Sequence, residues 1–212
     1  MRRQMNNLKR KQNYRKVSKT ILIVCEGEKT EKNYFESFRK DLHNSLINIQ
    51  DVKIIGTGYN TCSLVQKAKD LRIELKKEGK DFEITWVVFD KDSFASENFN
   101  KAIDSAKKCN IRVAYSNEAF ELWYLLHYAY IDAGLSRDQY KEKLTTRLGF
   151  KYEKNSKSMY STLLDRQTTA IINAKKLIEH HKTSNPNGLN PERDNPSTTV
   201  HELVEELNKY RK

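Results

Sequence analysis

The chain has 212 residues, of which 37% are hydrophobic and 32% are charged, and its formal net charge is +11. That length suits one α/β domain with a modest extension. No apolar run approaches the roughly 20 residues of a membrane span, and the N-terminus lacks the apolar core of a signal peptide, so we expect a cytoplasmic protein without a membrane partner. Cys25, Cys62 and Cys109 are far apart and form no C-x-x-C pair, so we expect reduced thiols rather than a disulfide framework or a zinc site.

The positive charge is concentrated at the N-terminus. Of the 39 lysines and arginines, eight lie in residues 1–20 together with no acidic residue, which leaves 31 basic against 28 acidic residues in the rest of the chain. Residues 1–18 are also poor in apolar side chains, so we predict a disordered basic tail. This tail either keeps the protein soluble or neutralises the phosphates of a nucleic acid. The second interpretation assigns nucleic-acid binding to Arg10, Lys11, Arg15 and Lys16.

The segment from residue 19 to residue 116 alternates between two kinds of pattern. Short runs rich in β-branched and aromatic residues predict strands, and longer segments with apolar residues at helical spacing predict helices. This alternation predicts right-handed βαβ units and a parallel four-stranded sheet flanked by helices. The predicted strands are 21–24, 51–56, 82–89 and 111–116, and the predicted helices are 31–42, 61–79 and 98–108.

The character of the sequence changes after residue 116. Only helical patterns follow, apart from a stretch at 184–197 that three prolines and a glycine mark as a loop. We therefore predict that residues 117–212 form an α-helical extension packed on the α/β core. The predicted helices of this extension are roughly 120–130, 137–148, 161–181 and 198–211.

Acidic residues follow two of the predicted strands. Glu26 comes directly after the first strand, and Asp90 and Asp92 come after the third. Because the carboxyl ends of parallel strands meet at one edge of a sheet, we expect these three carboxylates to converge there. Carboxylate oxygens suit Mg²⁺ or Mn²⁺, with Glu26 acting either as a further ligand or as a general acid or base. The competing interpretation is that these acids only cap helices or solubilise loops.

Further candidate residues lie near the same edge. Glu121 opens the helix after the fourth strand, where an acid is also an ordinary helix-dipole partner. Lys29 and Thr30 open the first helix, and a lysine at a helix N-terminus suits a phosphate. Arg147 belongs to a stretch in which basic and aromatic residues interleave, as in surfaces that contact a nucleic-acid backbone, although a solvated helix face has the same composition.

Several motifs together resemble a known family. ILIVCEGEKTEKNYF at 21–35, WVVFDKDSF at 86–94, SNEAFELWYLLHY at 116–128 and NPSTTVHELVEEL at 195–207 are similar to the RloB-like family. The Glu-Gly turn and the Asp-x-Asp pair also look like the Toprim pattern of topoisomerases and primases. The resemblance implies a Toprim-like fold, a Mg²⁺-dependent nuclease with a functional Glu121, and a prokaryotic restriction or abortive-infection system that includes an ABC-type ATPase partner.

Two functional hypotheses follow. The first is a metal-dependent nucleic-acid phosphodiesterase whose catalytic residues are Glu26, Asp90, Asp92 and Glu121, the first three of which hold the metal. The second is a non-catalytic regulatory subunit that binds nucleic acid or an ATPase through the tail and the helical extension. Metal binding at the acidic edge separates the two hypotheses, because a ligand that binds the folded state raises its melting temperature.

Overall fold

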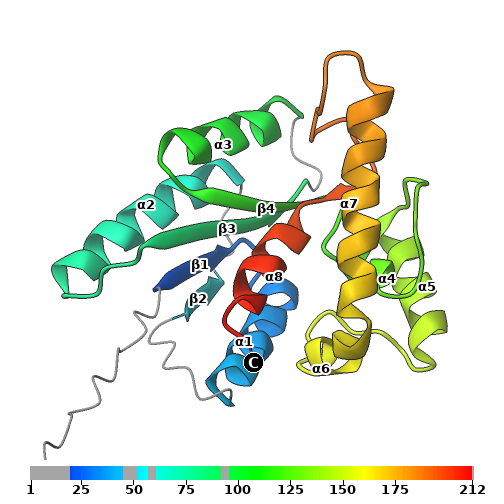
Figure 1. Ribbon diagram of the computed structural model, residues 1–212, viewed down its shortest axis with the longest axis horizontal. Helices are drawn as coiled ribbons and strands as arrows, with labels where there is room; N and C mark the ends of the chain where they lie inside the picture. The colour runs from blue at the N-terminus through cyan, green and yellow to red at the C-terminus, as the bar shows by residue number, and fades with distance from the viewer. Residues whose placement is uncertain (1–19, 45–51, 57–60, 92–95, 212) are drawn as a thin grey trace, which may run out of the picture.

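A sheet of four parallel strands forms the centre of the protein (Figure 1). The computed structural model describes residues 20–44, 52–56, 61–91 and 96–211, so the predicted basic tail lies outside the described residues. The strands run in the order β2-β1-β3-β4, and each of these pairs is parallel, as predicted. Their bounds are β1 (Ile21–Cys25), β2 (Val52–Gly56), β3 (Ile84–Asp90) and β4 (Arg112–Asn117).

The prediction of a purely parallel sheet is wrong. A fifth strand, β5 (Ser197–Thr198), pairs antiparallel with the end of β4, so the sheet is mixed. Two residues are too few to show any alternation of apolar and polar side chains, and they follow the proline that marked this stretch as a loop. The strand was therefore invisible in the sequence pattern.

Helices cover both faces of the sheet. Successive side chains of β1 point to opposite faces: Ile21 and Ile23 pack towards α1, whereas Leu22 and Val24 pack towards α2 and α3. Every residue of β1 is fully buried, which explains the unbroken apolar run in the sequence. The three crossover helices are α1 (Thr30–Asn44), α2 (Thr61–Lys77) and α3 (Ser96–Lys108).

The C-terminal helices share one core with α1 and its face of the sheet. Residues of α1 and α8 (Val200–Asn208) belong to this core, and in Figure 1 the other C-terminal helices gather at one end of the sheet. The predicted helix at 120–130 is only six residues long, and the one at 161–181 is divided by a short 3-10 turn at Leu164–Arg166. The helices are α4 (Glu121–Leu126), α5 (Arg137–Leu148), α6 (Met159–Leu163), α7 (Gln167–Ser184) and α8 (Val200–Asn208).

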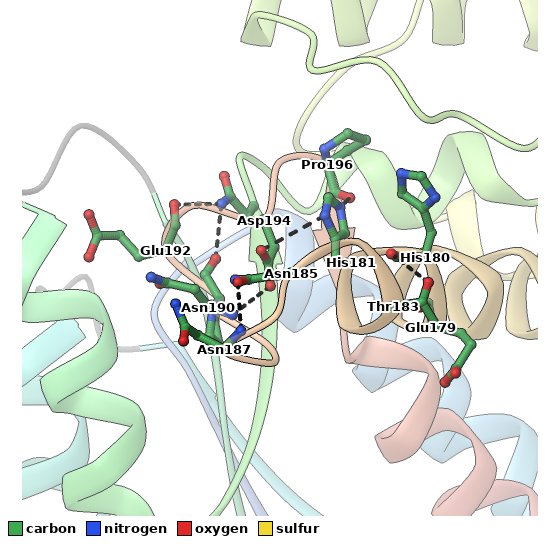
Figure 2. A network of polar contacts seen from close by, with 12 residues as sticks. Glu179, His180, His181, Thr183, Asn185, Asn187, Asn190, Glu192, Asp194 and Pro196 are labelled. Atoms are coloured by element: carbon green, nitrogen blue, oxygen red, sulfur yellow. Dashed lines mark hydrogen bonds and ion pairs between the residues drawn. The ribbon is translucent and has the colours of Figure 1, made fainter.

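A polar loop at 185–196 carries the chain from α7 back to the sheet (Figure 2). The side chain of His181 donates from Nε2 to the carbonyl oxygen of Pro196 at 2.9 Å, and its Nδ1 lies 3.8 Å from Asp194 Oδ1. Asp194 Oδ2 in turn accepts a hydrogen bond from the Asn190 backbone N–H at 2.7 Å. These contacts hold the loop in the conformation that delivers β5 to the edge of β4.

No helix within the described residues is long and apolar enough to cross a membrane. Within the described residues, Cys25 is buried and Cys109 is half-buried, and neither forms a disulfide bond.

The contact between α1 and α6 can be tested through Phe38. The Phe38 ring stacks on the ring of Tyr160, with centroids 4.8 Å apart, and both side chains are buried. We expect Phe38→Leu to lower the free energy of unfolding by about 1–2 kcal/mol, because it removes the stacking and leaves a small void. Urea denaturation measures this change.

Ile172→Val, at a position 60% exposed on α7, is the control and should change stability by less than about 0.5 kcal/mol. Equal effects of the two variants would contradict the packing described.

Candidate functional site

Glu26 and Asp90 lie side by side at the carboxyl edge of the sheet. Glu26 directly follows β1, and its backbone N–H continues the pairing of the strands by donating to the Val88 carbonyl oxygen at 2.8 Å. The backbone N–H of Asp90, the last residue of β3, donates to Glu26 Oε2 at 3.3 Å. The structure therefore brings together two acids that are 64 positions apart in the sequence, as the parallel topology predicts.

Glu31 is a third carboxylate at this edge, and the sequence interpretation did not identify it as a site residue. It lies in the first turn of α1 and is only 6% exposed. A Cβ atom at Gly27 would collide with the Glu31 carboxylate, so glycine at this position allows the acid to fold back onto the turn. An acid four residues after a turn glycine is the one sequence feature that could have pointed to it.

Glu121 is the fourth carboxylate, and it comes from the start of α4. Its side chain is buried, and Oε1 accepts a hydrogen bond from the Tyr152 hydroxyl at 3.1 Å. The Lys154 ammonium lies 3.9 Å from the same oxygen. Both partners belong to the segment between α5 and α6, so the helical part of the chain completes a site that begins on the sheet.

One cleft of about 320 Å³ gathers these groups. Cations from three different segments line it beside the acids, which partly balances the negative charge. The charged residues that line the cleft are Glu26, Glu28, Lys29, Glu31, Asp90, Glu121, Arg137 and Lys154.

Two of these carboxylates, Asp90 and Glu31, resist ionisation. Burial holds the pKa of Asp90 well above its usual range, and the neighbouring charges of Glu31 and Glu121 raise it further. Burial also raises the pKa of Glu31 to about 7, reinforced by Glu121 and partly offset by Lys154 and Arg137. Because these acids repel one another, they gain stability from any cation that approaches them.

The donor set fits a hard divalent cation. Carboxylate oxygens are the preferred protein ligands of Mg²⁺, and Asp90 Oδ1 is buried with no hydrogen-bond partner among the described residues. Within the same part of the chain, no three His, Cys, Asp or Glu side chains already form a metal-ligating group. Asp92, the remaining predicted ligand, lies outside the described residues.

Two of the predicted nucleic-acid contacts, Lys29 and Arg147, line different hollows. Lys29 lines the cleft and is exposed. Arg147 lies on α5 and lines a different hollow, together with Leu125 and Ile131. The tail residues Arg10, Lys11, Arg15 and Lys16 lie outside the described residues.

The fold and the cleft define an α/β protein with an acidic site at the carboxyl edge of its sheet, covered from one side by C-terminal helices. The family model described as RloB-like protein matches residues 21–207, and the chain belongs to this family. No curated protein and no solved structure matches the chain.

The raised pKa of Glu31 predicts a dependence of stability on pH. Between its ordinary pKa of 4.5 and about 7, the folded protein binds a proton that the unfolded chain has released, so stability falls as the pH rises through this window. Glu31→Gln keeps the shape of the side chain without the charge. We expect this variant to unfold at a higher temperature than wild type at pH 8, by the equivalent of about 1–3 kcal/mol, and to lose most of the advantage at pH 4.5.

Thermal unfolding of both proteins across this pH range measures the effect. Glu28→Gln, at an exposed position in the same turn, is the matched control and should leave the profile as in wild type. A profile for Glu31→Gln that runs parallel to wild type would show that Glu31 ionises normally.

Proposed function

We propose that the protein is a Mg²⁺- or Mn²⁺-dependent phosphodiesterase that acts on nucleic acid, with a Toprim-like arrangement of its catalytic acids. The observation that carries the proposal is the meeting of Glu26 and Asp90 at the carboxyl edge of the sheet, where ligands of open α/β sheets bind. The two buried acids from α1 and α4, Glu31 and Glu121, add to the negative charge there.

The acids would have distinct tasks in this proposal. Glu26 and Asp90, joined by Asp92 from the segment that follows, would hold the metal ion, which when bound supplies Lewis-acid polarisation of a phosphoryl oxygen. Glu121, whose side chain is held by the hydrogen bond from the Tyr152 hydroxyl, would line the cleft beside the metal ion. Glu31 adds a carboxylate on the α1 side.

A phosphodiester substrate suits the cations around these acids. Lys29 directly precedes α1, whose N-terminus is favourable for a phosphate. The formal net charge of +11 favours the approach of a polyanion. A small neutral substrate would use neither feature.

The proposal also includes a cellular setting, which rests on the family resemblance. Because the family resembles restriction-linked and abortive-infection proteins, we propose that the nuclease works in a prokaryotic antiviral system beside an ABC-type ATPase. Comparison of cleavage with and without such an ATPase, in the presence of ATP, tests whether a partner controls the activity.

Two substitutions test the proposed site. Glu26→Gln and Asp90→Asn each remove a charge and keep the shape of the side chain. We expect each to lower Mg²⁺- or Mn²⁺-dependent cleavage of labelled DNA or RNA by about 100-fold or more, while the far-UV circular dichroism stays that of wild type. Asp104→Asn, at an exposed position on α3 over the opposite face of the sheet, is the control and should cleave as wild type does.

If both variants cleave as fast as wild type does, this cleft is not the active site. A wild-type protein that neither cleaves any single- or double-stranded polymer nor gains thermal stability from Mn²⁺ would instead support the alternative of a non-catalytic regulatory subunit.

A further inference from the structure

A segment at 149–158 crosses the N-terminal half of α1 and contributes Lys154 to the lining of the acidic cleft. We refer to this segment as the α5–α6 strap. Side chains from one face of α1 donate to three of its backbone carbonyl oxygens, each at 3.0 Å: Thr30 to Lys154, Asn33 to Asn155 and Ser37 to Lys157. Because the backbone of the strap accepts these bonds, they do not depend on its charged side chains.

Lys154 is the strap residue whose ammonium enters the cleft. Its Nζ lies 3.9 Å from Glu121 Oε1, yet the side chain is 47% exposed, whereas that of Glu121 is 4% exposed. The lysine therefore reaches from solvent towards a buried carboxylate. Its charge also extends to Glu31, whose pKa it lowers.

The position of Lys154 has two electrostatic consequences. Its positive charge stabilises the ionised carboxylates, and it repels any other cation that binds among them. Its exposed ammonium, a compact point charge on a flexible stem, can also reach a phosphate at the mouth of the cleft. One residue can therefore oppose metal binding and favour substrate binding.

We propose that Lys154 tunes the acidic cleft in these two ways: it weakens the binding of a divalent cation to the carboxylates, and it contacts a phosphate of the nucleic-acid substrate. This inference rests on the proposed function, and it adds a residue outside the sheet to the groups that contact the substrate. A phosphate bound to the Lys154 ammonium would offset its positive charge and so reduce its repulsion of the divalent cation. Substrate and metal would therefore each strengthen the binding of the other.

Lys154→Gln tests both effects. Without nucleic acid, we expect this variant to bind Mn²⁺ about two- to five-fold more tightly than wild type in a calorimetric titration, in line with the modest strength of a half-exposed charge pair. In the presence of Ca²⁺, its affinity for a labelled oligonucleotide should instead fall several-fold. The substitution keeps the backbone carbonyl that Thr30 binds, so the strap should stay in place.

Two controls separate the role of Lys154 from a general effect of charge. Lys151→Gln removes the same charge from an exposed position of the strap that does not line the cleft, and should leave Mn²⁺ affinity unchanged. Lys154→Arg keeps the charge and should bind Mn²⁺ as wild type does.

The outcomes separate this inference from the proposed function. One outcome is that wild type binds Mn²⁺, Glu26→Gln does not, and Lys154→Gln binds it no more tightly than wild type. This result would contradict the proposed role of Lys154 and support the metal site. If neither wild type nor Lys154→Gln binds Mn²⁺, both proposals fail together. Tighter Mn²⁺ binding by Lys154→Gln with undiminished oligonucleotide affinity would overturn the phosphate contact.

Discussion

Mutual repulsion among four carboxylates, two of them buried and two half-buried, is the constraint on which the proposed function depends. The parallel order of β1 and β3 forces Glu26 and Asp90 to the same edge of the sheet. The first turn of α1 and the start of α4 then add Glu31 and Glu121 to the same small cleft. Placing four acids together opposes folding unless they retain protons, pair with cations or bind a metal. In the proposed function, a bound divalent cation relieves this repulsion.

The C-terminal helices contribute to this site as well as to the core. They pack against α1 and one face of the sheet, and the strap between α5 and α6 follows the first turns of α1. This packing carries the Tyr152 hydroxyl and the Lys154 ammonium to Glu121. The acids thus come mainly from the α/β part of the chain, whereas two of the three cations that line the cleft, Arg137 and Lys154, come from the helical part. Both parts are needed to set the electrostatic balance of the cleft.

The sequence predicted the features that depend on local pattern. The unbroken apolar run before Glu26 gave β1 correctly, because a strand buried on both faces carries no polar residue. The alternation of strands and helices then placed Glu26 and Asp90 at one edge. β5 was missed because two residues carry no periodicity, and its place depends on the polar loop before it. Glu31 was missed because an acid in the first turn of a helix is ordinary, and only its contact with Gly27 distinguishes it. Lys154 and Glu121 are 33 positions apart in the chain, and only tertiary packing brings their side chains close together.

A crystal structure of the protein soaked in Mn²⁺ tests the central claim most directly, because the anomalous scattering of manganese locates the ion independently of any assay. The account predicts anomalous density within ligand distance of the Glu26 and Asp90 carboxylates, inside the cleft that Glu31 and Glu121 border. Manganese bound only elsewhere on the protein, or no anomalous density in the cleft at saturating Mn²⁺, would contradict it.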